Sequence, residues 1–182
     1  MSLRSLPFLL AMLAWFPWAA QASAINICYH YGCSRHAYVD ISAEADAWLA
    51  ARLSEANSPE TERSAVGDAV TALYHIAART LPIWQDKGGN FRDGPAEGRM
   101  DCVDHSSNVT TFLTYLQDHG WLQYHTVGKP AWRAPRLLDL HYTAVLRDML
   151  SGQDWAVDSW FKDFGQAPVV LALDIWMEGY SP

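Results

Sequence analysis

The sequence of 182 residues has few positive charges and no cluster of them. Lysine and arginine together number 13 against 20 acidic residues, which gives a formal net charge of −7 with neutral histidines. We therefore expect no nucleic-acid partner, because phosphate binding requires a basic surface. A disordered chain is also excluded, since half of the residues are hydrophobic and nine are tryptophan. The length and this composition predict one domain with a substantial core.

Long hydrophobic runs are also missing. The longest run, residues 6–20, has about fifteen residues, whereas a membrane-spanning helix needs about twenty. Arg4 precedes this run and the small residues at 22–24 follow it, which is the pattern of a secretory signal peptide. The sequence therefore predicts export rather than membrane insertion.

We expect the signal peptide to comprise residues 1–24, with cleavage after Ala24 or after Ala22. The remainder, residues 25–182, is then a single domain that is periplasmic or secreted. Cys28 does not follow the small residues that a lipid-attachment site requires, so no stable membrane anchor is expected after cleavage.

Cysteine is scarce as well, and the number of cysteines is odd. Cys28 and Cys33 lie five positions apart, and we expect them to form a short-loop disulfide in an oxidising compartment. The alternative is a metal clip in which His30 and His36 join the two thiols. Either pairing leaves Cys102 alone, and a free thiol in an oxidising compartment is a liability unless it has a function.

Cys102 lies where the sequence predicts the start of a helix. Asp101 is a good N-cap, Asp104 occupies the second position of a capping box, and Gly120 is typical of the residue after a helix C-terminus. Between them, apolar residues recur at helical spacing: Val109, Phe112, Leu113 and Leu116. A thiol at the first helical position faces unpaired backbone N–H groups and the positive end of the helix dipole, which favour the thiolate.

Two interpretations of Cys102 remain open. The neighbouring Asp101 and Asp104 disfavour a thiolate, so activation of the thiol requires a nearby cation, for which an imidazolium is the most plausible candidate. Without such a cation, Cys102 would be an inert packing residue that happens to begin a helix.

The rest of the chain predicts an α+β fold, with helices first and a mostly antiparallel sheet after them. One helix is expected over residues 42–55, and a second begins with Ser58 as N-cap and ends near Pro82. After Gly120 the hydrophobic period changes from 3.6 to 2, which indicates strands. We expect strands over residues 121–127, 138–146 and 155–160, and a further buried strand or short helix over residues 169–176.

The segment 86–99 is rich in glycine and predicts a loop that delivers Cys102 to the surface. It lacks the Gly-Lys-Ser/Thr ending of a phosphate loop, so a nucleotide site is not expected. Three side chains with oxygen ligands, Asp86, Asn90 and Asp93, leave a calcium site open as an alternative, although their spacing does not match an EF-hand. We predict no other metal or cofactor.

Two residues of the predicted strands complete a catalytic set with Cys102. His141 and Asp158 lie on successive strands that a turn connects. Nucleophilic catalysis by a thiol requires a base within hydrogen-bond reach and a third group that fixes the tautomer of the base. A simple hairpin centred on residues 151–152 would place Asp158 opposite Val145, two same-face pairs beyond His141. A bulge, a curl or a shifted register of the second strand is therefore required.

The runs Asp-Cys-Val-Asp-His at 101–105, Leu-His-Tyr-Thr-Ala-Val-Leu at 140–146 and Asp-Trp-Ala-Val-Asp-Ser-Trp at 154–160 occur in this order. Together they resemble the transglutaminase-like branch of the papain-like cysteine hydrolases, and the layout is most similar to bacterial transglutaminase-like cysteine proteinases. The resemblance implies a transglutaminase-like fold with the nucleophile at a helix N-terminus packed on the sheet. It also implies Cys102 as the nucleophile, His141 as the base and Asp158 as the group that orients it. The chain departs from the family at residues 142–143, where alanine usually follows the histidine directly.

The oxyanion donor and the remaining histidines are the last candidates. The backbone N–H of Cys102 is one candidate donor, and Trp84 and Gln85 lie where such folds often place another. His105 lies one turn beyond Cys102, where a contact with the site is one interpretation, but we expect a polar residue on the helix face. His119 and His125 are expected at the surface.

The sequence thus predicts an exported thiol hydrolase, a cysteine peptidase or amidase, that acts on protein or peptide substrates, with cell-envelope components among its expected partners. Transglutaminase-like amide transfer or protein crosslinking is the second interpretation of the same residues. A catalytically silent domain of this fold that binds protein or envelope components is the main rival. A metal-binding accessory protein that uses the aspartates near Cys102 is a third.

Overall fold

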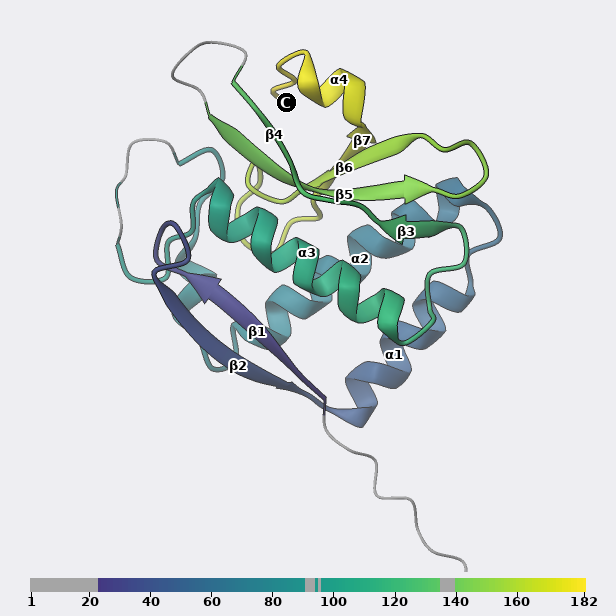
Figure 1. The fold of residues 1–182 in the computed structure, drawn as a ribbon. Coiled ribbons are helices and arrows are strands. Elements are labelled where there is room, and N and C mark those ends of the chain that lie inside the picture. The colour runs from purple at the N-terminus through teal and green to yellow at the C-terminus, as the bar shows by residue number, and fades with distance from the viewer. Residues whose placement is uncertain (1–22, 91–93, 95, 135–139) are drawn as a thin grey trace, which may run out of the picture.

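The computed structural model describes residues 23–90, 94, 96–134 and 140–182 (Figure 1). Its elements follow in the order β1 (Ser23–Tyr29), β2 (Arg35–Ile41), α1 (Ala43–Ser54), α2 (Pro59–Ala77), the 3₁₀ helix η1 (Pro82–Gln85), α3 (Cys102–Asp118), β3 (His125–Val127), β4 (Ala131–Arg133), β5 (His141–Asp148), β6 (Asp154–Asp158), β7 (Val169–Ala172) and α4 (Leu173–Met177). None of the helices in these ranges combines the length and the apolar character that a membrane crossing requires.

The two upstream helices begin at side-chain caps. The Ser42 hydroxyl accepts a hydrogen bond from the backbone N–H of Ala45 and caps α1. At the start of α2, Ser58 and Thr61 form a capping box, each side chain accepting from the backbone N–H of the other. Such caps satisfy N–H groups that have no partner within the helix. Both helices were expected at these positions and are confirmed.

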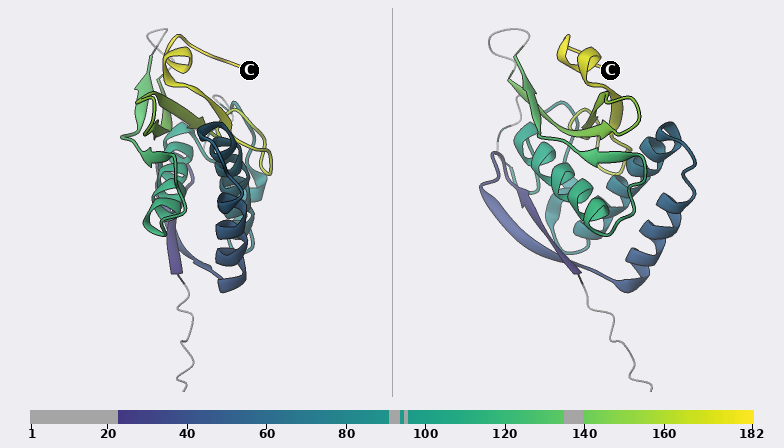
Figure 2. Two further views of the ribbon diagram at one scale, coloured as in Figure 1. Left: turned by 90° about the vertical axis from the view of Figure 1, so that its right-hand side faces the viewer. Right: turned by 45° about the vertical axis from the view of Figure 1, so that its right-hand side comes forward.

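Helix α3 is central to the fold. It packs against β1 on one side and against β5 on another, and α2 packs against it as well. In the side view of Figure 2, α1 and α2 lie on one side of the molecule and α3 on the other. The predicted apolar stripe of α3 is fully buried, and Gly120 after its end has a positive φ of 71°. The predicted boundaries of this helix are confirmed.

The larger sheet is antiparallel throughout and has the order β3-β5-β6-β7, with β4 also paired to β5. β3 pairs with the end of β5 and β4 with its start, whereas β6 pairs only with residues 144–147 on the other side of β5. The architecture is therefore mixed α+β with an antiparallel sheet, as the sequence predicted.

Two details of the predicted order are wrong, and the last predicted element is confirmed. The described chain begins with the antiparallel hairpin β1–β2 rather than with a helix, and Ser23 and Ala24 of the expected signal peptide belong to β1. The strand expected over residues 121–127 is reduced to β3, and β4 was not expected. Residues 169–176, for which a strand or a helix was expected, contain both β7 and most of α4.

Candidate active site

Cys102 is the first residue of α3, as the capping pattern predicted. One carboxylate oxygen of Asp101 accepts hydrogen bonds from the backbone N–H groups of Val103 and Asp104, both at 3.0 Å. The Asp104 carboxylate accepts in return from the backbone N–H of Asp101 at 3.1 Å. This capping box fixes the first turn of α3, and with it the backbone of the thiol.

The loop between β1 and β2 is docked onto this helix end. The backbone N–H groups of Tyr31 and Cys33 donate to the Asp104 carboxylate at 2.8 and 2.6 Å, and that of Gly32 donates to Asp101 at 2.9 Å. These N–H groups converge because residues 30–33 all have positive φ, a backbone concavity that suits an anion. The two aspartates are thus occupied in joining the hairpin to α3.

The Cys28–Cys33 disulfide closes this loop, so the predicted pairing is confirmed. The alternative metal clip is wrong, because both sulfurs are consumed in the disulfide. The Asn108 side chain adds a second link, since it accepts from the backbone N–H of Cys28 and donates to its carbonyl, both at 2.8 Å. Cys102 is left as the free cysteine of the described residues.

His141 and Asp158 form a buried pair at the far side of the site. His141 Nε2 and Asp158 Oδ2 are 2.7 Å apart, and each residue is only 2% exposed. The same oxygen accepts a hydrogen bond from the indole N–H of Trp176 at 2.8 Å, and the other oxygen accepts from the backbone N–H of Trp160 at 3.0 Å. Asp158 is therefore fully engaged and fixes both the orientation and the tautomer of His141.

The register of β5 and β6 explains how this pair forms. Ala144 pairs with Val157, so one further step would set Asp158 opposite Thr143. Thr143 and His141 lie on the same face of β5, and Asp158 thereby becomes the diagonal neighbour of the histidine. A simple hairpin would have placed Asp158 opposite Val145, and the observed register is shifted from it by two residues. Of the three alternatives that the sequence left open, a bulge, a curl or a shifted register, the structure has the shifted register.

The turn between the strands sets this register. The Asp148 carboxylate accepts hydrogen bonds from the backbone N–H groups of Leu150 and Ser151, at 2.8 and 3.0 Å. Gly152 completes the turn with a φ of 72°, a conformation that favours glycine. These bonds also lower the pKa of Asp148, with the bond from Ser151 having the largest effect.

Aromatic rings enclose His141. The ring centroids of Trp160, Phe161 and Trp176 lie 4.6, 5.1 and 5.4 Å from the imidazole centroid. Arg133 holds this wall in place, because its guanidinium lies 4.3 Å above the Trp176 ring and donates to the backbone carbonyls of Trp176 and Tyr180. The enclosure removes the His141–Asp158 bond from water, which strengthens it. The sequence alone did not indicate a role for these residues.

The thiol of Cys102 lies at the start of β5. Its Sγ is 3.8 Å from the carbonyl oxygen of Leu140, and the backbone N–H of Tyr142 donates to the sulfur. Pairing of β5 with β6 begins only at Ala144, so the thiol contacts a backbone edge beyond the paired part of β6. The Cys102 thiol therefore forms hydrogen bonds with the backbone of Leu140 and Tyr142, the residues that flank His141 in the sequence.

The second imidazole nitrogen of His141 makes no hydrogen bond. Nε2 is bonded to Asp158, whereas Nδ1 is buried and has no hydrogen-bond partner. A buried polar atom without a partner is costly in a folded protein and is a common feature of functional sites. One nitrogen of this fixed imidazole is thus without a hydrogen-bond partner, and the Cys102 thiol interacts with the backbone of Leu140 and Tyr142 rather than with it.

Burial of Cys102 has the opposite effect from the one expected at a helix N-terminus. It raises the pKa of the thiol to about 11, and the charges of Asp101 and Asp158 raise it further, while the N–H groups of Tyr142 and of Cys102 itself act in the other direction. The thiol is thus protonated near neutral pH unless a cation or a base acts on it.

Both upstream candidate oxyanion donors, Trp84 and Gln85, lie in η1. The Trp84 side chain is 61% exposed, and Gln85 ends η1 in a partly buried position. The next residue, Asp86, accepts a hydrogen bond from the backbone N–H of Met100 at 2.9 Å. Asp86, which follows Gln85, thus links the end of η1 to the segment that leads into Cys102.

The oxygen ligands of the expected calcium site are used in other ways. Asp86 is bonded to Met100 and to His105, at 2.9 and 2.8 Å. The Asn90 amide donates to the Met100 carbonyl and accepts from the indole N–H of Trp160. Protein donors thus occupy the Asp86 carboxylate where a cation would have to bind. The third expected ligand, Asp93, lies outside the described residues.

Two histidines differ from the sequence-based expectation. His105 is 4% exposed and His125 is 1% exposed, so neither is at the surface. His125 is bonded through Nδ1 to the buried Glu62 at 2.7 Å, and His105 is bonded to Asp86 and Ser159. His119 is exposed, as expected. The buried pairs were missed because their carboxylates come from distant parts of the chain.

Comparison with protein-family models, with curated protein sequences and with solved structures gave no match for this chain. The chemistry of the site therefore rests on the geometry of its own residues.

Proposed function

We propose that this chain is a thiol hydrolase, a cysteine peptidase or amidase of the papain-like, transglutaminase-like class, with Cys102 as nucleophile, His141 as base and Asp158 as the group that orients the base. The observation that carries the proposal is the buried His141–Asp158 bond of 2.7 Å in an imidazole whose Nδ1 is unused. A base held in one tautomer by a carboxylate is the arrangement that thiol catalysis needs.

The reaction would proceed through an acyl-enzyme. His141 Nδ1 takes the thiol proton, and the Cys102 sulfur attacks the carbonyl carbon of an amide to give a tetrahedral intermediate. The imidazolium returns its proton to the amine nitrogen, the C–N bond breaks, and the amine leaves behind a thioester on Cys102. A water molecule then gives a proton to His141 and attacks the thioester, which releases the carboxylic acid and restores the thiol.

The negative oxygen of the tetrahedral intermediate needs donors of its own. The backbone N–H of Cys102 lies at the N-terminus of α3, whose first N–H groups and dipole favour negative charge. We propose Gln85 as the second donor, because its neighbour Asp86 is bonded to the segment that leads into Cys102. The exposed indole of Trp84 is the alternative.

Export belongs to the same proposal. A signal peptide that ends at Ala22 fits the fold better than one that ends at Ala24, because Ser23 pairs with Ile41 and its hydroxyl lies 2.5 Å from that of Tyr115. Cleavage after Ala22 keeps these contacts, whereas cleavage after Ala24 removes them. The expected substrates are then proteins or peptides of the cell envelope or outside the cell.

Amide transfer is the second candidate function, since an amine can replace water in the attack on the thioester. The rival is a silent domain that only binds protein or envelope components. The unused Nδ1 of His141 favours catalysis over this rival, because a binding domain has no need of a buried imidazole with a free nitrogen.

The test uses the mature chain with an unfolded protein as substrate, and Cys102→Ala as the control. We expect new peptide termini, or deamidated side chains, to be detected by mass spectrometry with the wild type and not with the control. A primary amine added to the same assay separates transfer from hydrolysis, because transfer incorporates the amine into the substrate. Binding of the substrate by both proteins without any product, and without acyl-Cys102 in the intact mass, would favour the silent domain.

A further inference from the structure

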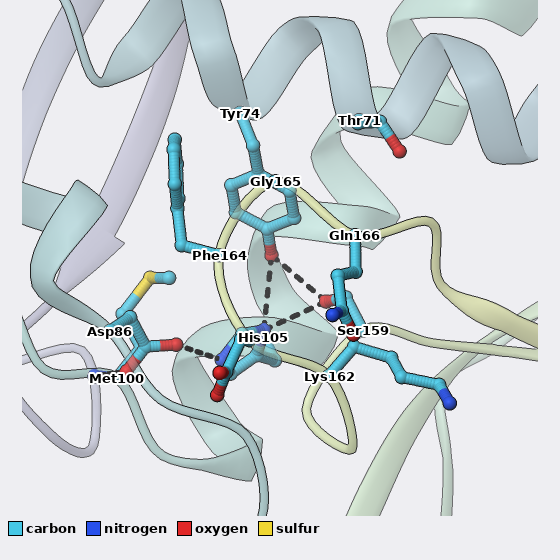
Figure 3. Close-up of a pocket in the computed structure, with 11 residues that line it drawn as sticks. Thr71, Tyr74, Asp86, Met100, His105, Ser159, Lys162, Phe164, Gly165 and Gln166 are labelled. Carbon is cyan, nitrogen blue, oxygen red and sulfur yellow. Dashed lines mark hydrogen bonds and ion pairs between the residues drawn. The ribbon is translucent and has the colours of Figure 1, made fainter.

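A second buried network joins Tyr74, Asp86, His105 and Ser159 (Figure 3). His105 of α3 is bonded through Nε2 to Asp86 at 2.8 Å and through Nδ1 to the Ser159 hydroxyl at 2.7 Å. The Tyr74 hydroxyl of α2 lies 3.1 Å from that of Ser159 and 3.4 Å from His105 Nδ1. Asp86, His105 and Ser159 are between 2% and 6% exposed.

The same residues resemble a second Ser-His-Asp triad, but the space around them does not fit a substrate. The cavity that they line has a volume of about 20 Å³, which is room for a water molecule and not for a peptide. The Ser159 hydroxyl is also held by both His105 and Tyr74. The network is therefore not suited to nucleophilic attack by Ser159.

What the network does is to connect the two halves of the catalytic site. Asp86 holds the backbone N–H of Met100, two residues before Cys102. Ser159 directly follows Asp158 in the sequence. His105 lies between them, one turn after Cys102, and bonds to both ends. One imidazole thus joins the segment that carries the nucleophile to the segment that carries the orienting carboxylate.

A parallel link strengthens this connection. Asn90 donates to the Met100 carbonyl at 2.9 Å and accepts from the indole N–H of Trp160 at 2.8 Å. The backbone N–H of Trp160 in turn donates to Asp158. Both links therefore run from Met100 to the residues that follow β6.

We propose that His105 is a positioning residue for catalysis: it sets the separation between the Cys102 segment and the His141–Asp158 pair by bridging Asp86 and Ser159. This inference rests on the proposed thiol chemistry. A displacement of about 1 Å between reacting groups can cost a hundredfold in rate, so a bridge that holds them has a functional effect beyond stability.

The fold offers a matched control for the loss of a buried histidine. His125 is bonded to Glu62 at 2.7 Å and is as deeply buried as His105, but it joins α2 to β3 and has no bond to the catalytic segments. His105→Asn and His125→Asn should both lower the Tm. Only the first should disturb the geometry of Cys102 and His141.

The experiment measures the rate of Cys102 alkylation by iodoacetamide from pH 5 to 10 in the full mature chain, well below each Tm. For His105→Asn we expect the fast reaction below neutral pH to fall by about tenfold or more, toward the profile of His141→Ala. For His125→Asn we expect the wild-type profile despite the lower Tm. Equal profiles for His105→Asn and wild type would overturn the proposal.

Milder variants keep the test decisive if His105→Asn does not fold. Ser159→Ala removes one end of the bridge and should lower the rate at pH 6 by about threefold to tenfold, whereas Ser159→Thr keeps the hydroxyl and should restore it. Unchanged rates for Ser159→Ala would count against the bridge. A wild type that itself shows no fast reaction below pH 7 would instead refute the proposed function, so the two failures are distinguishable.

Discussion

The variant His141→Ala tests most directly whether the imidazole ionises the Cys102 thiol. Burial, together with the charges of Asp101 and Asp158, raises the pKa of this thiol to about 11 from an ordinary 9.0. The backbone N–H groups that contact the sulfur do not compensate. Once His141 is removed, the thiol should therefore stay protonated throughout the neutral range.

The expected magnitude follows from the ionised fractions. At pH 8, a thiol with a pKa of about 11 is about 0.1% ionised, whereas one with a pKa of about 9 is about 10% ionised. Cys102 in the variant should thus react with iodoacetamide about a hundred times more slowly than an ordinary cysteine. In the wild type, proton transfer to His141 creates the thiolate, so we expect fast alkylation already at pH 6, at least about a hundredfold above the variant.

The assay is the second-order rate constant of alkylation between pH 5 and 10, followed by intact mass. A single adduct is expected, because Cys28 and Cys33 are joined in the disulfide. Gln153→Ala, on the exposed turn between β5 and β6, serves as a control and should retain the wild-type profile. The reasoning is refuted if wild type and His141→Ala give the same profile, or if the variant titrates near the ordinary pKa of about 9.

Three further predictions concern the surroundings of the triad. Trp176→Phe keeps a ring beside His141 but removes the N–H that donates to Asp158. We therefore expect the free energy of unfolding to fall by about 2 kcal/mol and the Tm to fall by about 4–8 °C in thermal melts. An unchanged Tm would mean that this hydrogen bond does not stabilise the fold. Gln85→Ala should lower kcat about a hundredfold with little change in KM if Gln85 donates to the oxyanion, and steady-state kinetics with a full kcat would exclude it. Burial also raises the pKa of Tyr74, so the folded state keeps the proton on Tyr74 at a pH where the unfolded chain loses it. The free energy of unfolding should therefore decrease as pH rises above about 9, and urea titrations of Tyr74→Phe should show a shallower decrease.

The parts of the fold that the sequence predicted depend on local chemistry. The helix starts at Ser58 and Asp101 are determined by side chains three residues apart, and the end of α3 by a single glycine. Cys102 could be placed at a helix N-terminus for the same reason. The Cys28–Cys33 pairing was also a local prediction, because the two residues lie in one short loop.

The parts that were missed depend on contacts between distant segments. The strand β1 has an alternating pattern, with Ile25 and Ile27 buried, but it overlaps the residues that also match a signal-peptide cleavage site. The buried position of His105 depends on Asp86 and Ser159, which lie 19 and 54 positions away. No periodicity in the sequence could have indicated that they meet. The exact register of β5 and β6 likewise depends on the Asp148 turn.

The tryptophan-rich C-terminus shows how one segment can combine packing and catalysis. Trp176 is fully buried, which is what its hydrophobicity alone predicts. Its indole N–H, however, has to find an acceptor once the ring is buried, and the acceptor is the carboxylate that orients His141. A phenylalanine would keep a buried ring at this position but would leave the Asp158 oxygen with one donor fewer. The Arg133 guanidinium stacks over the Trp176 ring and donates a hydrogen bond to the Tyr180 carbonyl. These contacts fix the segment that follows β7 beside His141 and Asp158. The polar ends of buried aromatic residues therefore connect the last segment of the chain to the base of the proposed reaction.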